Sequence, residues 1–328
     1  MSNWISNCTA DAMHNAAANL ALGVLVAFPT ETVYGLGADA TNPQAVARIY
    51  QVKGRPTDHP LIVHIAGLEY LDQWISDIPE YAIALARKFW PGPMTLILRR
   101  SELAKDYVTG GQDTVGIRIP SNSLALALLE AFHKLGGQGV AAPSANRFGQ
   151  VSPTTAEAVQ EELGGFLLDT DLILDGGSSE VGLESTIIDC TGVLPRILRP
   201  GAITISMLEE VTGLKVPSSL EAKSNDFRVE NIRVSGTLEN HYAPKAKVFL
   251  DQQPTAGSGF IALEIINTPA GVIRLAAPKS VEEFARVLYS ALREGDHQNL
   301  DAIYIAQPNG EGLAIAIRDR LSRSARGR

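Results

Sequence analysis

The feature that most constrains the fold is the alternation of short, β-branched apolar runs with stretches of helical length. Residues 23–28 (GVLVAF) and 61–65 (LIVHI) are short apolar runs and are predicted as strands. Between them, Asn42-Pro43 pairs an N-cap residue with proline at the first helical position, which predicts a helix continuing through Tyr50. Hairpin-like and crossover spacings are mixed, so we expect an α/β fold with a mixed twisted sheet and flanking helices.

The same patterns continue along the chain. Further strands are expected at residues 94–98, 114–119, 139–142, 172–174 and 185–189, with helices opened by Pro79, by Ser121 and by a Thr154–Glu157 capping box. Residues 207–245 are polar and predict a connector. After them, strand-like runs at 247–250, 259–263, 271–275 and 302–306 alternate with helices at 284–293, ended by Gly295, and 313–321. We therefore predict an α/β domain over 1–206, a linker over 207–245 and a small Rossmann-like βαβ domain over 246–328.

Charge is unevenly distributed in this 328-residue chain of net charge −8. Residues 1–150 hold 11 basic and 12 acidic side chains, residues 151–245 hold 7 and 15, and residues 246–328 hold 10 and 9. The acidic total argues against a chain held along nucleic acid or an anionic membrane. Since the excess lies in the middle segment, residues 1–150 remain free to build a locally positive pocket.

Cysteine content and the N-terminus bear on the compartment. Two cysteines, Cys8 and Cys190, exclude a disulfide framework and a four-cysteine zinc site. The first basic residue is Arg48, so no signal-peptide n-region is present, and the apolar run 20–29 is too short to span a bilayer. We expect a soluble cytoplasmic protein without membrane association.

Several catalytic signatures are absent from the sequence. There is no G-x-x-x-x-G-K-[ST] phosphate loop, no complete dinucleotide fingerprint after Gly35-x-Gly37, and no H-E-x-x-H. The six histidines are scattered, so spacing indicates no metal site. No nucleophile is accompanied by an evident base, which disfavours covalent catalysis.

Four polar clusters follow predicted strands or helices. They are 29–37 (PTETVYGLG), 53–56 (KGRP), 142–146 (APSAN), and 184–186 (EST) together with 199–201 (RPG). The first suits a small-ligand loop or a tight turn, and the third suits ribose or phosphate contacts or a helix cap. In the second, an extended chain would point Lys53 and Arg55 to the same side, where they would clamp a polyphosphate or form a solvated surface pair. In the fourth, Arg199 needs an anion, either a ligand or a nearby acid.

Together these clusters offer hydroxyls and cations without a nucleophile. Such a site works by positioning and charge neutralisation, as phosphoryl and adenylyl transfer do.

The ordered motifs resemble those of the YrdC-like threonylcarbamoyl-AMP synthases in their long, two-domain form. The resemblance rests on PTETVYGLG (29–37), KGRP (53–56), PLIVHI (60–65), WPGPMT (90–95), GIRIP (116–120), APSAN (142–146), SPT (152–154), ESTI (184–187), LRPG (198–201), HYAPKA (241–246) and GLAIAIRDRLSRSA (312–325). It covers nearly the whole chain, and HYAPKA is a motif that the short form lacks.

The resemblance implies an activity and partners. L-threonine, bicarbonate and ATP would give L-threonylcarbamoyl-adenylate and pyrophosphate, with Mg²⁺ accompanying ATP. The adenylate would pass to downstream tRNA threonylcarbamoyl transferase proteins that modify the adenosine beside the anticodon.

The resemblance also implies site residues. Lys53 and Arg55, with Ser144 and Asn146, match a K-x-R…S-x-N signature around the phosphates. The positions that would bind ATP further include His59, Thr114, Ser152, Arg199 and Tyr242, and those that would bind threonine are Thr32, His64, Arg118, Ala142 and Ser185. His59 departs from the family pattern, in which asparagine is common. His241-Tyr242 would belong to a loop folding over the nucleotide, and we interpret it as a lid that excludes water.

Three alternative functions are consistent with parts of the sequence. A tRNA- or double-stranded-RNA-binding protein would use the basic tail (Arg318, Arg320, Arg323, Arg326 and Arg328), which we instead interpret as a solvated last helix turn, so stable tRNA binding is not expected. A hydrogenase-maturation carbamoyltransferase shares the core domain, but its full version needs zinc fingers that two cysteines cannot supply. A paralogue without turnover is disfavoured by the intact K-x-R and S-x-N positions.

Overall fold

The larger sheet of the computed structural model, which describes residues 4–7, 9–217, 232–236 and 242–327, mixes parallel and antiparallel pairs. Its strands are β1 (Ile5–Asn7), β2 (Val26–Phe28), β3 (Gly35–Asp39), β4 (Ile62–His64), β5 (Ile75–Asp77), β6 (Met94–Arg100), β7 (Thr114–Arg118), β8 (Val140–Ala141), β9 (Leu172–Asp175), β10 (Thr186–Asp189) and β11 (Arg196–Arg199). The order is β1-β9-β2-β3-β8-β4-β7-β6-β10-β11, with β5 on β6. The β2–β3, β4–β8 and β6–β7 pairs are antiparallel, whereas β4–β7 and β6–β10 are parallel, so the predicted mixed α/β sheet is confirmed.

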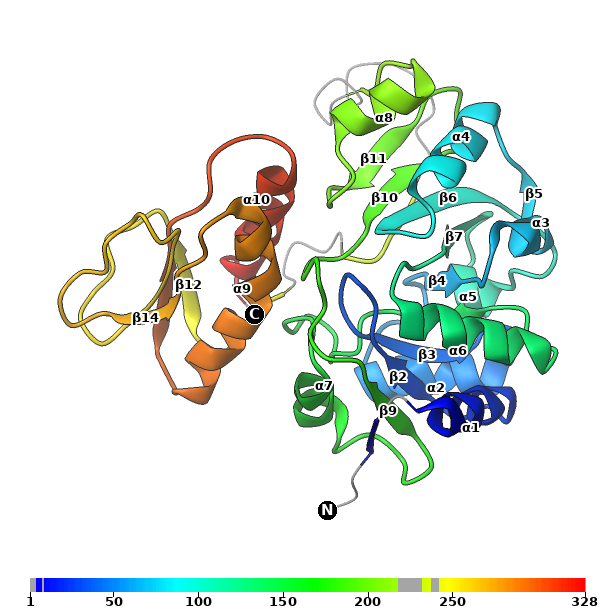
Figure 1. Ribbon diagram of the computed structural model, residues 1–328, viewed down its shortest axis with the longest axis horizontal. Helices are drawn as coiled ribbons and strands as arrows, with labels where there is room; N and C mark the ends of the chain where they lie inside the picture. The colour runs from blue at the N-terminus through cyan, green and yellow to red at the C-terminus, as the bar shows by residue number, and fades with distance from the viewer. Residues whose placement is uncertain (1–3, 8, 218–231, 237–241, 328) are drawn as a thin grey trace.

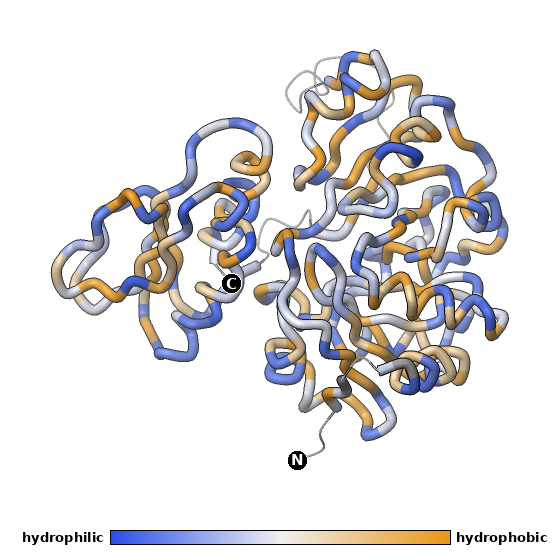
Figure 2. The backbone as a smooth tube through the Cα atoms, viewed as in Figure 1, coloured by the Kyte–Doolittle hydropathy of each residue, from blue (hydrophilic) through white to orange (hydrophobic). Residues whose placement is uncertain are grey.

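Helices cover this sheet from more than one side (Figure 1). They are α1 (Ala10–Ala21), α2 (Pro43–Lys53), the 3-10 helix η1 (Leu68–Tyr70), α3 (Leu71–Trp74), α4 (Glu80–Phe89), α5 (Asp106–Thr109), α6 (Ser123–Lys134), α7 (Ala156–Leu163) and α8 (Ile205–Thr212). Side chains alternate along β2: Val26 and Phe28 pack with α1 and α6, whereas Ala27 packs in a second cluster with α2 and α7. Figure 2 shows the corresponding alternation of hydrophobic and hydrophilic residues along the helices.

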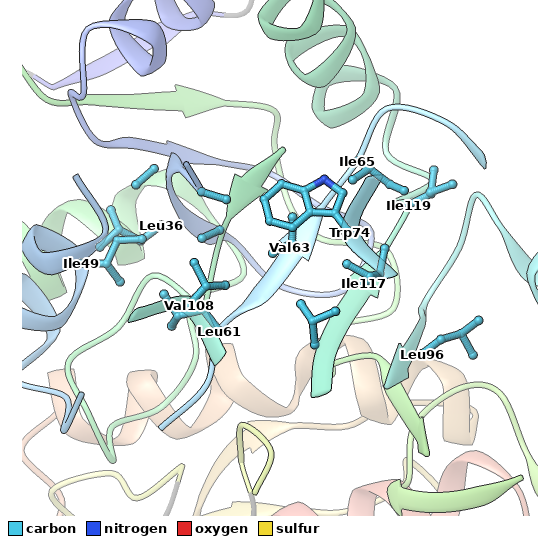
Figure 3. Close-up of a cluster of buried hydrophobic side chains, with 14 of the residues drawn as sticks. Leu36, Ile49, Leu61, Val63, Ile65, Trp74, Leu96, Val108, Ile117 and Ile119 are labelled. Carbon is cyan, nitrogen blue, oxygen red and sulfur yellow. The ribbon is translucent and has the colours of Figure 1, made fainter. Parts of the chain in front are cut away.

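The main core lies around Trp74, which is fully buried. Figure 3 shows its indole among Val63, Ile65 and Ile117, side chains of the central part of the sheet. Because β4 and β7 are packed on apolar side chains here, their carboxyl ends, at His64 and Arg118, are fixed relative to each other in parallel register. This pairing positions two of the predicted site residues.

A second, four-stranded sheet follows in the chain, and all its pairs are parallel. It consists of β12 (Lys247–Leu250), β13 (Gly259–Ile261), β14 (Ile273–Ala276) and β15 (Ala302–Ile305), in the order β12-β15-β13-β14, with helices α9 (Val281–His297) and α10 (Leu313–Ser324). Figure 1 shows α9 and α10 on the side of this sheet that faces the larger part of the molecule. Val33, Val151 and Leu183 of the larger part pack in one apolar cluster with Phe284 and Leu288 of α9.

Several local predictions were wrong at the cap positions. Asn122, not Ser121, caps α6, since its side chain accepts from the backbone N–H groups of Leu124 and Ala125 at 3.0 and 3.1 Å. Thr155, not Thr154, caps α7.

Gly295 was expected to end α9 but lies inside it. A Cβ there would come within 2.5 Å of Ile303 Cδ1, so this glycine permits close packing of α9 on β15. The sequence patterns also gave no indication of β1, α1, β3, β5, β11 or α8. No helix in the described ranges is long and apolar enough to cross a membrane.

Candidate functional site

The four polar clusters converge on one pocket. Thr30 and residues 32–35 come from the β2–β3 hairpin, Ile62 and His64 from β4, and Arg118 from the end of β7. The rest of the lining is Lys53, Arg55, Ala142, Pro143, Ser144, Phe148, Glu184, Ser185, Arg199, Ser235, Gly236 and Tyr242. Of the predicted site residues, the pocket brings together Thr32, Lys53, Arg55, His64, Arg118, Ala142, Ser144, Ser185, Arg199 and Tyr242.

Lys53 reaches the pocket from the last residue of α2, not from an extended chain. Gly54 follows in the left-handed conformation, with φ of 61°, so the chain reverses direction between Lys53 and Arg55. The expected i, i+2 alignment on one extended segment is therefore wrong, although both side chains line the pocket. Lys53 is 2% exposed, and its Nζ donates to the carbonyl oxygens of Ser144, at 2.6 Å, and Asn146.

Two arginines approach from other segments. Arg55 donates from Nη2 to the carbonyl of Pro60 and to Ser235 Oγ, both at 3.0 Å. Arg199, at the end of β11, donates to the Ser185 carbonyl and hydroxyl and to the Ser235 carbonyl. Within the described part of the chain, every hydrogen bond of Lys53, Arg55 and Arg199 ends on a carbonyl or hydroxyl oxygen. Three buried cations thus share a pocket without a bonded carboxylate, an arrangement that favours an anionic ligand.

Burial lowers the pKa of all three cations, Arg199 included. Burial, followed by the nearby charge of Arg55, lowers the pKa of Lys53 well below its usual value. Burial also lowers the pKa of Arg55 to about 10. A polyanion bound between them would restore both pKa values, because it favours the charged forms.

Arg118 has a different partner. Its Nη2 lies 2.7 Å from Glu31 Oε1, and both side chains are buried. Arg118 Nε and Glu31 Oε2 are buried atoms for which the described residues supply no hydrogen-bond partner. The pair therefore fixes the guanidinium while leaving one donor unsatisfied beside the pocket.

His64 lies next to Arg118 in the β4–β7 register. Burial, and secondly the charge of Arg118, lowers the pKa of His64 to about 3. The imidazole is therefore neutral near neutral pH. Its Nδ1 is buried with no partner among the described residues, so it is available to a ligand.

Four predicted residues lie near the pocket but outside its lining. Thr114 lines a small neighbouring cavity with Arg233 and Ser235. Asn146 donates to the carbonyls of Arg147 and Gln150, and Ser152 Oγ donates to Glu184 Oε1 at 2.7 Å. The half-buried His59 packs edge-on against Phe148, with ring centroids 5.3 Å apart. His241 lies outside the described residues.

No role was predicted from the sequence for several lining residues. Ser235 and Gly236 belong to the polar connector, where no motif marks them. Glu184 stood in a quoted motif without an assigned role. Phe148 lies beneath Arg55, 5.8 Å from ring centroid to guanidinium carbon. The sequence signal that could have indicated Phe148 is its place as an aromatic residue two positions after Asn146, just after a predicted ligand-binding segment.

The basic tail differs from the solvated helix turn that we expected. Arg320 is fully buried and ion-paired with Glu184. Arg318 donates to the carbonyls of Pro308 and Gly310, and Arg323 pairs with Asp319. Arg328 lies outside the described residues. These contacts engage Arg318, Arg320 and Arg323 within the chain, which weakens the RNA-binding alternative.

Comparison with known proteins agrees with this geometry. A family model described as "Telomere recombination" matches residues 18–201, and one described as "Threonylcarbamoyl-AMP synthase, C-terminal domain" matches residues 203–326. The threonylcarbamoyl-AMP synthase of Pyrococcus abyssi is 40% identical, with 94% of this chain and 93% of the relative covered. That of Bacillus subtilis is also 40% identical, with 95% and 92% covered. A crystal structure of Pyrococcus abyssi Sua5 complexed with L-threonine matches with a TM-score of 0.86 at 38% identity, covering 98% of both chains. The chain therefore belongs to the two-domain threonylcarbamoyl-AMP synthases.

Proposed function

We propose that this pocket makes L-threonylcarbamoyl-adenylate from L-threonine, bicarbonate and ATP, with release of pyrophosphate. A threonylcarbamoyl-AMP synthase uses ATP as a substrate. The observation that carries the proposal for this pocket is the convergence of Lys53, Arg55 and Arg199 without a bonded carboxylate in the described residues. A triphosphate supplies the missing negative charge.

Threonine would bind on the β4–β7 side of the pocket. Arg118 Nε would donate to the substrate carboxylate, and Glu31 holds the guanidinium in place for that contact. The neutral His64 would exchange a hydrogen bond with threonine rather than act as a base. Thr32, Ala142 and Ser185 line the same pocket and complete the proposed threonine site. The threonine complex of the Pyrococcus abyssi relative supports this half of the proposal.

ATP would occupy the side that carries the three cations. We propose that Lys53 and Arg55 are the catalytic residues and that Ser144, Asn146 and Arg199 assist them around the phosphates. The further proposed ATP contacts are His59, Thr114, Ser152 and Tyr242. Arg55 presents a planar fork of donors and Lys53 a point charge, so their contributions differ in geometry.

The proposed chemistry needs no protein nucleophile. The threonine amine adds to the carbon of bicarbonate, and loss of water gives the carbamate. A carbamate oxygen then attacks the α-phosphorus of ATP, the bond from that phosphorus to the bridging oxygen breaks, and pyrophosphate leaves. Lys53 and Arg55 would stabilise the negative charge that grows on the leaving group.

Magnesium does not fit a site built by the protein in the described ranges. These contain no group of three or more His, Cys, Asp or Glu side chains that could hold a metal ion. The two acids nearest the chemistry, Glu31 and Glu184, are both paired with arginine. We propose that Mg²⁺ arrives with the triphosphate, whose oxygens are its usual ligands.

We keep the proposed division into a catalytic domain over 1–206, a linker over 207–245 and a small domain over 246–328. Tyr242 of this linker is fully buried in the pocket wall. We propose that Tyr242 helps to exclude water from L-threonylcarbamoyl-adenylate, a mixed anhydride that water can hydrolyse. If Tyr242→Ala changes neither ATP affinity nor the lifetime of the product, that role is refuted. We propose that the adenylate product passes from this pocket to tRNA threonylcarbamoyl transferase proteins.

Pyrophosphate release from ATP tests the proposal. Release should require both threonine and bicarbonate, and mass spectrometry should detect the adenylate. Lys53→Met and Arg55→Met should each lower kcat/KM by about 10²-fold to 10³-fold, whereas Lys88→Met, on the exposed face of α4, should leave it unchanged. Threonine-independent release would refute the proposal. Turnover of carbamoyl phosphate in place of threonine and bicarbonate would favour the carbamoyltransferase alternative.

A further inference from the structure

The carboxylate of Glu184 in the pocket wall is held from the C-terminal helices. Arg320 of α10 donates from Nε to Glu184 Oε2 at 2.8 Å. The Tyr289 hydroxyl of α9 lies 3.0 and 3.2 Å from the two carboxylate oxygens, and Ser152 Oγ donates to Oε1 at 2.7 Å. Both oxygens of Glu184 therefore accept hydrogen bonds within the protein, which holds the carboxylate in the pocket wall.

Arg320 also contacts the segment that follows β11, which lies beside Glu184. Its Nη2 donates to the carbonyl of Pro200 at 2.9 Å, directly after Arg199. Glu184 directly precedes Ser185, and Ser185 in turn accepts hydrogen bonds from Arg199. Arg320 thus contacts Glu184 and Pro200, and each of these is the chain neighbour of one partner in the Ser185–Arg199 hydrogen bonds. Its own side chain is fully buried and does not line the pocket.

Charge explains why this contact matters for a triphosphate. Burial opposes ionisation of Glu184, but the charges of Arg320 and then Arg199 hold the pKa of Glu184 at about 2. Glu184 is therefore an anion in the wall of a pocket that receives a polyanion. Without Arg320, the nearest cation left to neutralise it is Arg199, which would be drawn from Ser185 toward Glu184.

We infer that Arg320 is a positioning residue for nucleotide binding: it neutralises Glu184 and so keeps Arg199 directed into the pocket. This inference rests on the proposed placement of ATP beside Arg199. It assigns to the C-terminal helices a direct effect on the substrate site. Arg320 touches no substrate in this arrangement and acts through Glu184 and the Pro200 carbonyl.

Four variants of the full chain test the inference. Arg320→Met leaves Glu184 uncompensated, Arg320→Lys keeps the charge but loses the fork, and Arg320→Met combined with Glu184→Gln removes both charges. Arg293→Met is the matched control, because it breaks an ion pair between the other C-terminal helix, α9, and the larger part of the chain, with Glu162 at 3.2 Å, and neither partner lines the pocket. The readouts are the Kd of a non-hydrolysable ATP analogue, the KM of threonine and the thermal midpoint.

The expected result separates nucleotide binding from folding. Arg320→Met should weaken binding of the ATP analogue by about tenfold or more, with a smaller change in the KM of threonine. Arg320→Lys should lie between Arg320→Met and wild type, and the double variant should recover most of the affinity. Arg293→Met should lower the thermal midpoint without weakening analogue binding. If Arg320→Met does not fold, Arg320→Lys and the double variant decide the question.

Two results would overturn the inference. One is unchanged analogue affinity in folded Arg320→Met or, if that variant does not fold, in Arg320→Lys. The other is an equal loss of affinity in Arg293→Met, which would show that any loosening of the C-terminal helices has the same effect. Failure of the proposed function looks different, because wild type would then bind the analogue without threonine-dependent release of pyrophosphate.

Discussion

Replacing His64 with asparagine should make the protein markedly less sensitive to acid. In the folded chain, burial and the charge of Arg118 lower the pKa of His64 from 6.5 to about 3. In the unfolded chain the imidazole returns to its ordinary pKa. Between these two values the folded state binds one proton fewer than the unfolded state, so stability falls as pH falls. Asparagine keeps a hydrogen-bonding side chain on β4 but does not titrate.

The size of the effect follows from the two pKa values. Each pH unit between them costs about 1.4 kcal/mol of stability, so the whole window amounts to about 4–5 kcal/mol. From pH 7.5 down to 4.5, His64 alone should account for a loss of about 2.7 kcal/mol. Glu184, whose pKa is lowered from 4.5 to about 2, loses its contribution only below pH 4.5. The window between pH 4.5 and 6.5 therefore isolates His64 from Glu184.

Urea unfolding at pH 7.5 and pH 4.5 measures this difference. Wild type should lose about 2–3 kcal/mol more than His64→Asn between the two conditions. His14→Asn is the control, because His14 is an exposed histidine on α1, and it should behave as wild type. Equal losses in wild type and His64→Asn would refute the assignment of a buried neutral imidazole, and with it the proposed hydrogen-bonding role toward threonine.

Three further predictions concern pocket residues and residues that pack next to the pocket. Glu31→Gln should raise the KM of threonine and lower the free energy of unfolding by about 3–5 kcal/mol, because it leaves Arg118 buried without its partner; steady-state kinetics and urea unfolding measure the two effects. ATP-analogue affinity should fall as pH rises through the lowered pKa of Lys53, and calorimetry across pH should find this slope reduced in Lys53→Met. Gly37→Ala should lower stability by about 1–3 kcal/mol in thermal unfolding, since its Cβ would lie 2.9 Å from the Phe28 ring.

Local patterns predicted those elements whose signals are local. Asn42-Pro43 opened α2 as expected, because the asparagine side chain accepts from two backbone N–H groups of the first turn. The run 61–65 contains β4, since a β-branched apolar segment suits a strand packed on both faces. In contrast, β3 begins inside the glycine-rich motif at Gly35, where little apolar alternation marks a strand. Its pairing with β2 and β8 is tertiary and leaves no local pattern.

The pocket residues were accessible from the sequence only in part. Motifs placed Lys53 and Arg55 together, but not the left-handed turn at Gly54 that brings them there from a helix end. The ion pair between Arg118 and Glu31 spans 87 residues, and nothing in the chain order pairs them. Connector residues such as Ser235 lie in a polar stretch that resembles any surface loop. Their place in the pocket depends on how residues 232–236 pack against the larger sheet.

Arg320 is the residue whose environment was least predictable from local sequence patterns. Along the chain it stands among arginines at positions 318, 323 and 326, and helical spacing alone favours a solvated basic face for such a series. What distinguishes it is Glu184, which lies 136 residues earlier, and a tyrosine on a neighbouring helix that shares the same carboxylate. A buried arginine is stable only where an anion and further acceptors pair with it. For Arg320 these partners are the carboxylate of Glu184 and the carbonyl of Pro200. These contacts connect the C-terminal sheet and helices to the wall of the nucleotide pocket, and for this reason we expect substitution of a residue outside the pocket to change the affinity for ATP.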